Sequence, residues 1–308
     1  MKSGGKILNQ GHIRNIMENS MVSKVLILGA KGMLGQELVS VFSDDEKYIV
    51  AGWDFGDIDV TDFVKAEEKI RTYAPDMLIN AVAYNAVDMC EESDEEYQKA
   101  MILNAEVPRF LAHLAKQMNI LFVHYSTDYV FDGADESGYR EDAKTNPISR
   151  YGMSKQAGEE NVIKEEGKYY IIRLSKLFGK PALSSIAKKS FFNIMLTLGK
   201  TRDEIQAVDD EKSCFTYAPD LARETKSLIE DTALFGIYHL PNSGDVTWYM
   251  AVQELYTQAK MSVIIHPVGS EAFPRPAKRP HYSKLLNTKR TPIRSYTEAL
   301  KDYLTFME

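Results

Sequence analysis

The chain has 308 residues, of which 44% are hydrophobic and 26% are charged, as is ordinary for a folded globular protein. The net charge of −7 and the absence of a long Lys/Arg run argue against nucleic acid as a partner. No apolar run approaches the roughly 18 residues of a membrane span. The two cysteines, Cys90 and Cys214, form no CxxC pair, which argues against a zinc site or a disulfide framework. We therefore expect a cytoplasmic protein that has no metal site and does not associate with membranes, with residues 1–21 as a flexible leader.

From Ser23 onward, short apolar runs alternate with longer amphipathic ones, as in a parallel sheet that is covered on both faces. Strands are expected at 24–28, 48–53, 76–81, 120–125 and 169–173. Helices are expected at 33–42, 61–73, 95–118 with a break near Pro108, and 147–165. This order predicts an α/β fold with a Rossmann-type doubly wound parallel sheet.

After Gly179 the alternation becomes irregular. Pro-rich loops and short strands separate helices expected at 188–198, 218–229, 247–260 and 297–306. We predict a dinucleotide-binding core over residues 22–180. Residues 181–308 would mainly form a smaller C-terminal substrate-binding lobe, with some segments returning to the core.

A glycine-rich segment follows the first strand and opens the first helix. Gly29, Gly32 and Gly35 have the spacing GxxGxxG, with Met33 and Leu34 between the last two. Glycines let the backbone turn sharply and approach a pyrophosphate, while a helix N-terminus directs N–H groups at the anion. A tight turn alone would also explain three glycines. The order of strand, loop and helix favours a dinucleotide site.

Acidic residues follow the second strand. Asp54 lies 22 residues after Gly32, where a carboxylate can accept hydrogen bonds from adenosine ribose hydroxyls and favour NAD over NADP. A solvated turn acid is an equal alternative, so both NADH and NADPH remain open as cofactors. Asp59 and Val60 could flank the adenine, whereas Asp62 is expected only to cap a helix.

The candidate catalytic pair is Tyr151 and Lys155, early in the helix expected at 147–165. Four-residue spacing places both side chains on one helix face. An ammonium beside a phenol lowers a tyrosine pKa that is normally about 10, which would make Tyr151 a general acid at neutral pH. Lys155 can also bind the nicotinamide ribose. Thr127 and Asp128 close the fourth strand, where a hydroxyl could bond a substrate carbonyl and a carboxylate could bind a substrate hydroxyl or order the loop.

Together these motifs resemble the extended short-chain dehydrogenase/reductases, and within them the dTDP-4-dehydrorhamnose reductase family. The resemblance runs from about Val25 to the C-terminus. The STDYVFDG and AKRP stretches are specific to this branch, whereas the glycine loop and YxxxK are shared with many relatives. The matching segments are GAKGMLG (29–35), DIDVTD (57–62), NAVAYNAVDMCE (80–91), LNAEVP (103–108), YSTDYVFDG (125–133), YGMSK (151–155), TYAPDLAR (216–223) and PAKRPHYSKL (276–285).

The resemblance implies that NADH or NADPH reduces the 4-keto group of a nucleotide-linked deoxy sugar, most simply a dTDP sugar of dTDP-L-rhamnose biosynthesis. Thr127, Tyr151 and Lys155 would act on the carbonyl. Asn104 would either support the cofactor site or only help to pack its helix. A homodimer remains open as the oligomeric state. The implied substrate contacts are Thr127, Asp128, Lys176 and Arg279. The implied cofactor contacts are Gly32, Met33, Leu34, Asp59, Val60, Ala81, Ala83, Tyr84 and Tyr125.

Three departures from the family pattern fall on the substrate side. Lys176 stands where the family has an aromatic residue, residues 210–216 lack the usual Gly and Pro, and Tyr282 replaces an Asn. The reaction type is therefore better defined than the substrate. Two alternatives remain: an epimerase or dehydratase of the same superfamily, and a non-catalytic cofactor-binding subunit like the regulatory subunit of methionine adenosyltransferase.

Overall fold

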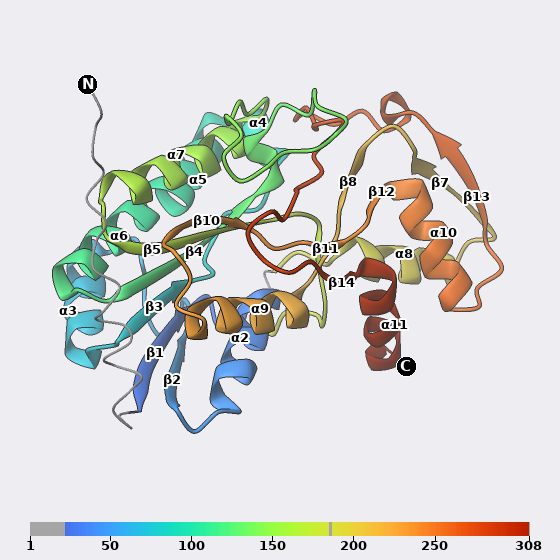
Figure 1. The fold of residues 1–308 in the computed structure, drawn as a ribbon. Helices are drawn as coiled ribbons and strands as arrows, with labels where there is room; N and C mark the ends of the chain where they lie inside the picture. Colours follow the sequence, from blue (N-terminus) through green and yellow to red (C-terminus); the bar gives the residue numbers. More distant parts are fainter. Residues whose placement is uncertain (1–21, 185–186, 308) are drawn as a thin grey trace.

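The computed structural model describes residues 22–184 and 187–307, and its centre is a six-stranded sheet (Figure 1). Neighbouring strands are parallel throughout, in the order β10-β5-β4-β3-β1-β2. This confirms the predicted Rossmann-type sheet. The sixth strand, β10, was not expected from the sequence. The strands are β1 (Ser23–Leu28), β2 (Tyr48–Trp53), β3 (Met77–Asn80), β4 (Leu121–Thr127), β5 (Lys168–Leu174) and β10 (Gly236–His239).

Helices cover both faces of this sheet, which is why its inner strands are apolar at nearly every position. Helices α2 (Met33–Ser43) and α9 (Ala218–Glu230) lie on one face. The opposite face carries α3 (Phe63–Tyr73), α6 (Val107–Met118) and α7 (Arg150–Lys164) (Figure 1). Helix α9 and strand β10 both come from beyond residue 180, so the C-terminal half of the chain completes the sheet and its cover.

The expected helix over 95–118 is continuous but not uniform. It consists of α5 (Asp94–Met101), a π-helical segment η1 (Ile102–Glu106) and α6, and the short α4 (Met89–Glu92) precedes it. The expected break near Pro108 is wrong. Pro108 lies in the first turn after the π segment, where its missing N–H removes no α-helical hydrogen bond.

A second hydrophobic core lies in the C-terminal part, to the right in Figure 1. Phe178, Phe192 and Phe215 are fully buried there and their rings contact one another. Three helices surround this core: α8 (Phe191–Gly199), α10 (Trp248–Gln258) and α11 (Tyr296–Met307). The paired strands are β6 (Leu177–Phe178) with β9 (Thr216–Tyr217), β7 (Glu204–Val208) with β13 (Ile264–Val268), β8 (Lys212–Cys214) with β12 (Asp245–Thr247), and β11 (Asn242–Ser243) with β14 (Ile293–Ser295).

Within the described residues there is neither a helix that could span a membrane nor a cluster of side chains that could hold a metal ion. No helix within 22–184 and 187–307 is both long and apolar enough to cross a bilayer. Within the same ranges, no group of three His, Cys, Asp or Glu side chains is placed to hold a metal ion. The expected leader, residues 1–21, lies outside the described residues.

Candidate active site

The glycine loop between β1 and α2 brings the backbone close to neighbouring segments. Gly29 has φ +78°, and a Cβ there would lie 3.0 Å from the carbonyl carbon of Ala81 at the end of β3. A Cβ at Gly35 would overlap the carbonyl oxygen of Gly29. Gly32 precedes α2 and caps it with no side chain, which leaves the first-turn amides of Met33, Leu34 and Gly35 without a side-chain acceptor. This cradle fits a pyrophosphate at a helix N-terminus.

Asp54 supports this loop from the end of β2. Its carboxylate accepts hydrogen bonds from the Lys31 amide at 2.9 Å and from the Phe55 amide at 2.9 Å. Asp59 instead accepts from the amide and hydroxyl of Thr61, at 2.9 and 2.6 Å, and these bonds lower the pKa of its carboxyl. Asp54 and Asp59 thus order the two turns that border the expected adenosine position.

Of three further residues, Asp62 was expected only to cap a helix, whereas Val60 and Ala83 were expected to border the cofactor. Asp62 caps α3, accepting from the Lys65 amide at 3.2 Å, as the sequence allowed. Val60 is buried against the sheet. Ala83 is half-buried in the segment after β3.

Asn104 in the π segment fixes the loop after β3. Its side-chain oxygen accepts from the Tyr84 amide at 2.9 Å, and its amide nitrogen donates to the Tyr84 carbonyl and to Ser154 Oγ, each at 3.0 Å. The side chain is completely buried. Asn104 therefore positions Tyr84 and ties the loop to α7, with its side-chain hydrogen bonds satisfied inside the protein.

The structure buries Tyr151 and Lys155 together in the first half of α7. Lys155 Nζ donates to the carbonyl oxygen of Tyr125 in β4 at 2.7 Å. The Tyr125 hydroxyl points elsewhere and bonds Thr225 Oγ1 at 2.9 Å, so Tyr125 meets the pair through its backbone. The Tyr151 hydroxyl lies 3.4 Å from Asn85 Oδ1, in the loop after β3.

Burial reverses one expectation about this pair. The pKa of Tyr151 is raised above its usual 10, mainly by desolvation, although a hydrogen bond with Thr127 lowers it in part. Desolvation also lowers the pKa of Lys155 to about 8. The expected lowering of the Tyr151 pKa by Lys155 is thus wrong for the chain as described. Loss of water around the phenol outweighs the Thr127 hydrogen bond, and Lys155 is not among the groups that shift this pKa.

Asp128 lies in a short 3-10 turn, η2 (Asp128–Val130), and is buried beneath the end of β4. Its Oδ2 accepts hydrogen bonds from Ser175, Ser213 and Ser283, at 2.9, 3.1 and 2.6 Å. Its Oδ1 accepts from Thr127 Oγ1 at 3.1 Å. Of the two roles open from sequence, these contacts favour ordering of the loops, because four hydroxyls from four segments already occupy the carboxylate.

Arg279, from the Pro-rich segment that follows the 3-10 turn η3 (Ser270–Ala272), pairs with Asp88. Its two terminal nitrogens, Nη1 and Nη2, donate to the carboxylate, with Nη2 at 2.6 Å from Oδ2. The Ala277 amide also donates to Asp88. Sequence reasoning missed Asp88, although it lies within the matching segment 80–91 and is the acid that faces the AKRP stretch.

Lys176 follows β5 with φ +42°, and its ammonium lies over two aromatic rings. Nζ is 4.1 Å from the ring centre of Trp248 and 5.6 Å from that of Phe215. The Trp248 indole donates to Glu211 at 2.9 Å, and Glu211 pairs with Arg275. Trp248, Glu211 and Arg275 were not predicted. Glu211 lies in the 210–216 loop that departs from the family pattern, whereas the one sequence signal for Trp248 and Arg275 was their place in the irregular C-terminal half.

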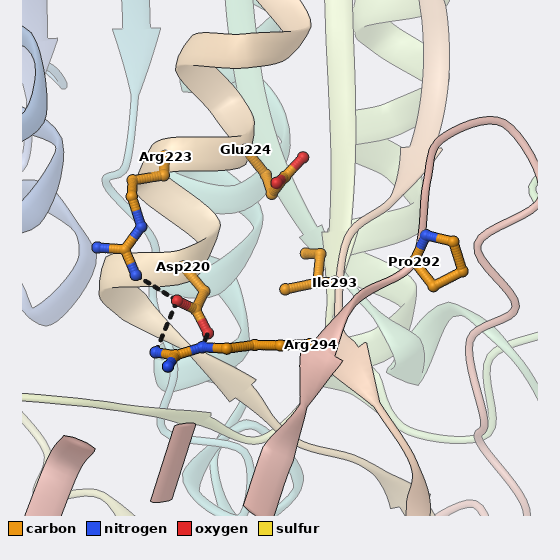
Figure 2. A pocket seen from close by; sticks show the side chains of 6 residues that line it. All are labelled: Asp220, Arg223, Glu224, Pro292, Ile293 and Arg294. Atoms are coloured by element: carbon orange, nitrogen blue, oxygen red, sulfur yellow. Dashed lines mark hydrogen bonds and ion pairs between the residues drawn. The ribbon is translucent and has the colours of Figure 1, made fainter. Parts of the chain in front are cut away.

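A separate pocket of about 400 Å³ lies between α9 and β14 (Figure 2). Figure 2 shows Asp220 facing both Arg223 and Arg294, and it pairs with both. Asp220 also accepts from Asn242. These charges neutralise one another, so this pocket is a structural junction and lies apart from Tyr151.

The parallel sheet, the glycine cradle and the buried Tyr151–Lys155 pair define a Rossmann-type NAD(P)-dependent oxidoreductase. Residues 23–308 match the family described as the RmlD substrate binding domain. The chain belongs to this family.

Relatives of this chain span nearly its whole length. A dTDP-4-dehydrorhamnose reductase of Streptomyces griseus is 33% identical over 290 residues, 90% of this chain and 91% of its own. A dTDP-4-keto-6-deoxy-D-glucose reductase of Streptomyces niveus is 31% identical over 289 residues, 91% of this chain and 96% of its own. The crystal structure of dTDP-4-dehydrorhamnose reductase from Bacillus anthracis in complex with NADP has a TM-score of 0.86 at 32% identity, covering 93% of this chain and 100% of that one.

Proposed function

We propose that this chain uses NADH or NADPH to reduce the 4-keto group of a dTDP-linked 6-deoxy sugar. Two relatives are named as reductases of such sugars, dTDP-4-dehydrorhamnose reductase and dTDP-4-keto-6-deoxy-D-glucose reductase. The observation that carries the proposal is the burial of Tyr151 and Lys155 beside Thr127 at the carboxyl end of β4. That edge of a parallel sheet is where the glycine loop after β1 also lies, so cofactor and carbonyl would meet there.

Each of the three residues has a role in this reaction. When bound, the nicotinamide supplies the hydride that reaches C4 of the sugar. Tyr151 donates its hydroxyl proton to the carbonyl oxygen, and its raised pKa keeps that proton in place until the oxygen becomes basic. Lys155 stabilises the resulting phenolate as a nearby cation. To orient the carbonyl beside Tyr151, the Thr127 hydroxyl would turn its proton from Asp128 Oδ1, its acceptor in this structure, to the carbonyl oxygen.

The two parts of the chain would have different roles. We propose that residues 22–180 bind the cofactor, with Gly29, Gly32 and Gly35 at the pyrophosphate. Residues 181–308, with Lys176, would mainly shape the sugar site. That the protein acts in the cytoplasm and that it forms a homodimer remain predictions.

The test is a spectrophotometric assay with NADH or NADPH and dTDP-4-dehydro-6-deoxy-L-mannose. We expect the wild-type chain to consume cofactor, and Tyr151→Phe to lose about 10²- to 10⁴-fold in kcat with little change in cofactor affinity. Tyr48→Phe is the matched control, because Tyr48 lies at the amino end of β2 and its hydroxyl bonds Glu230. Its kcat should equal that of the wild type.

Other results would assign the alternatives. Conversion of the sugar without net cofactor consumption would identify an epimerase. Cofactor binding without turnover, across a panel of keto-sugar nucleotides, would support the regulatory subunit and overturn the reductase.

A further inference from the structure

Within the described residues, Lys176 differs from the two arginines near the candidate site in having no anionic partner. Arg275 pairs with Glu211, and Arg279 pairs with Asp88. Lys176 Nζ makes no hydrogen bond or ion pair with any residue in the described ranges, and its contacts are the faces of Trp248 and Phe215. A cation over aromatic rings is attracted to them, but rings accept no conventional hydrogen bond.

The charged groups nearest Lys176 are already committed to other partners. Asp128 accepts four hydroxyls, and Glu211 accepts from Arg275 and the Trp248 indole. Desolvation lowers the pKa of Lys176 to about 8, although Asp128, Glu211 and Cys214 act to raise it and Arg275 acts to lower it. Within the described ranges, the protein therefore desolvates this ammonium and places no carboxylate in ion-pair contact with it.

Lys176 is joined to the candidate catalytic centre by a short chain of contacts. Its neighbour Ser175 donates to Asp128 Oδ2, and Asp128 Oδ1 accepts from Thr127. The backbone at Lys176 is held in the left-handed region, which lysine seldom adopts. Lys176 thus directly follows a residue that is tied to Thr127 through Asp128, and its ammonium lies over the rings of Trp248 and Phe215.

We propose that Lys176 is a specificity-determining residue that pairs with an anionic oxygen of the substrate, either a phosphate of the nucleotide or a carboxylate on the sugar. The inference rests on the proposed function, because it assumes that a sugar nucleotide occupies this site. A ligand anion would supply the missing counter-charge, and a half-desolvated ion pair contributes more than an exposed one.

The test compares wild type, Lys176→Met and Lys176→Arg, each saturated with NADPH. Calorimetry measures the affinity for dTDP and for thymidine, which lacks phosphate. Kinetics compare a dTDP-4-keto-6-deoxy sugar with a dTDP-4-keto hexuronate. Lys289→Met is the matched control, because Lys289 lies over the Tyr238 ring at the sheet edge. Thermal unfolding checks that each variant is folded.

If Lys176 binds phosphate, Lys176→Met should weaken dTDP binding by about 10- to 100-fold and leave thymidine unchanged. Wild-type affinity for dTDP should also fall as the pH rises through 8, where Lys176 loses its proton, and Lys176→Met should lack this fall. If Lys176 binds a sugar carboxylate, dTDP binding should be unchanged and kcat/KM should fall for the hexuronate alone. Lys176→Arg should keep most of the wild-type dTDP affinity or of the wild-type kcat/KM for the hexuronate. Lys289→Met should match the wild type in both.

Two results separate this inference from the proposed function. Wild-type reduction of a keto sugar, with both dTDP affinity and kcat/KM unchanged in Lys176→Met, would overturn the role of Lys176 and leave the reductase intact. A dTDP affinity that depends on Lys176, without reduction of any keto sugar, would refute the reductase and support the anion site.

Discussion

At the scale of single residues, burial acts in opposite directions on Tyr151 and Lys155. Removal of water makes the phenol hold its proton more firmly and makes the ammonium release its proton more readily. Lys155 is held by the Tyr125 carbonyl, which fixes the ammonium but adds no counter-charge. Near neutral pH, Tyr151 is therefore a neutral proton donor and Lys155 is a cation, and both states suit a carbonyl reductase.

A pH prediction follows for Lys155. We expect kcat to fall as the pH rises through about 8, because Lys155 then loses the charge that stabilises the phenolate. Lys155→Arg should lower kcat at neutral pH but move this fall to higher pH, since a guanidinium stays protonated. Steady-state kinetics across the pH range would measure both effects.

Two other causes of a fall in kcat with pH must be separated from this one: unfolding of the chain and titration of Lys176. The pKa of Lys155 is lowered on folding from 10.5 to about 8, so the unfolded chain binds more protons between these values. Its contribution to stability therefore rises with pH in that window, and unfolding driven by this lysine cannot cause the fall. Lys176→Met should keep the same fall in kcat. If it abolishes the fall, Lys176 is the titrating group.

At the scale of elements, the contact between α7 and the π segment η1 sets the position of the catalytic helix. Gly158 of α7 lies against the carbonyl oxygen of Asn104, where a Cβ would overlap it. Asn161 donates to the neighbouring Ala105 carbonyl at 3.2 Å. The widened turn thus presents carbonyls to α7, while the Asn104 side chain holds Tyr84.

Gly158→Ala tests this contact. We expect it to reduce the free energy of unfolding by about 1–3 kcal/mol, because an added methyl must push α7 from η1. It should also weaken NADPH binding through the displaced Tyr84 loop. Gly167→Ala is the control, since a Cβ there would lie 3.4 Å from Lys116 Cβ, an ordinary contact. Equal effects of the two substitutions on denaturant unfolding would contradict this role of Gly158.

At the scale of the whole molecule, Asp220 joins the sheet's cover to the C-terminal segments. It lies in α9, and its buried carboxylate accepts from Asn242 in β11. The same carboxylate accepts from Arg294 in β14 (Figure 2). The pairing of β11 with β14 places the chain's last helix, α11, directly after this junction. One carboxylate therefore holds three segments that are distant in sequence.

Asp220→Ala should lower the free energy of unfolding by about 3–5 kcal/mol, because it leaves a half-buried guanidinium without its main partner. Asp302→Ala removes the other partner of Arg294, but that carboxylate is 56% exposed and its loss should cost at most about 1 kcal/mol. Urea unfolding measures both. A similar cost for the two variants would show that burial does not strengthen the Asp220 pairs.

The sequence by itself determined the features that depend on local order along the chain. Alternating apolar and amphipathic runs determined the parallel sheet, and the glycine spacing after β1 determined the cradle that the backbone requires there. The YxxxK spacing placed Tyr151 and Lys155 on one face of a helix, and that helix is present. These features are encoded by neighbours within a few residues, so periodicity and spacing suffice to predict them.

Only the tertiary structure decided the surroundings of those residues. The partners of Asp128 come from residues 127, 175, 213 and 283, and Asp88 meets Arg279 across 191 positions. The direction of the Tyr151 pKa shift, the added strand β10 and the ring contacts of the Lys176 ammonium likewise depend on which segments pack together. Desolvation and charge pairing arise from long-range contacts, which no local pattern of residues records.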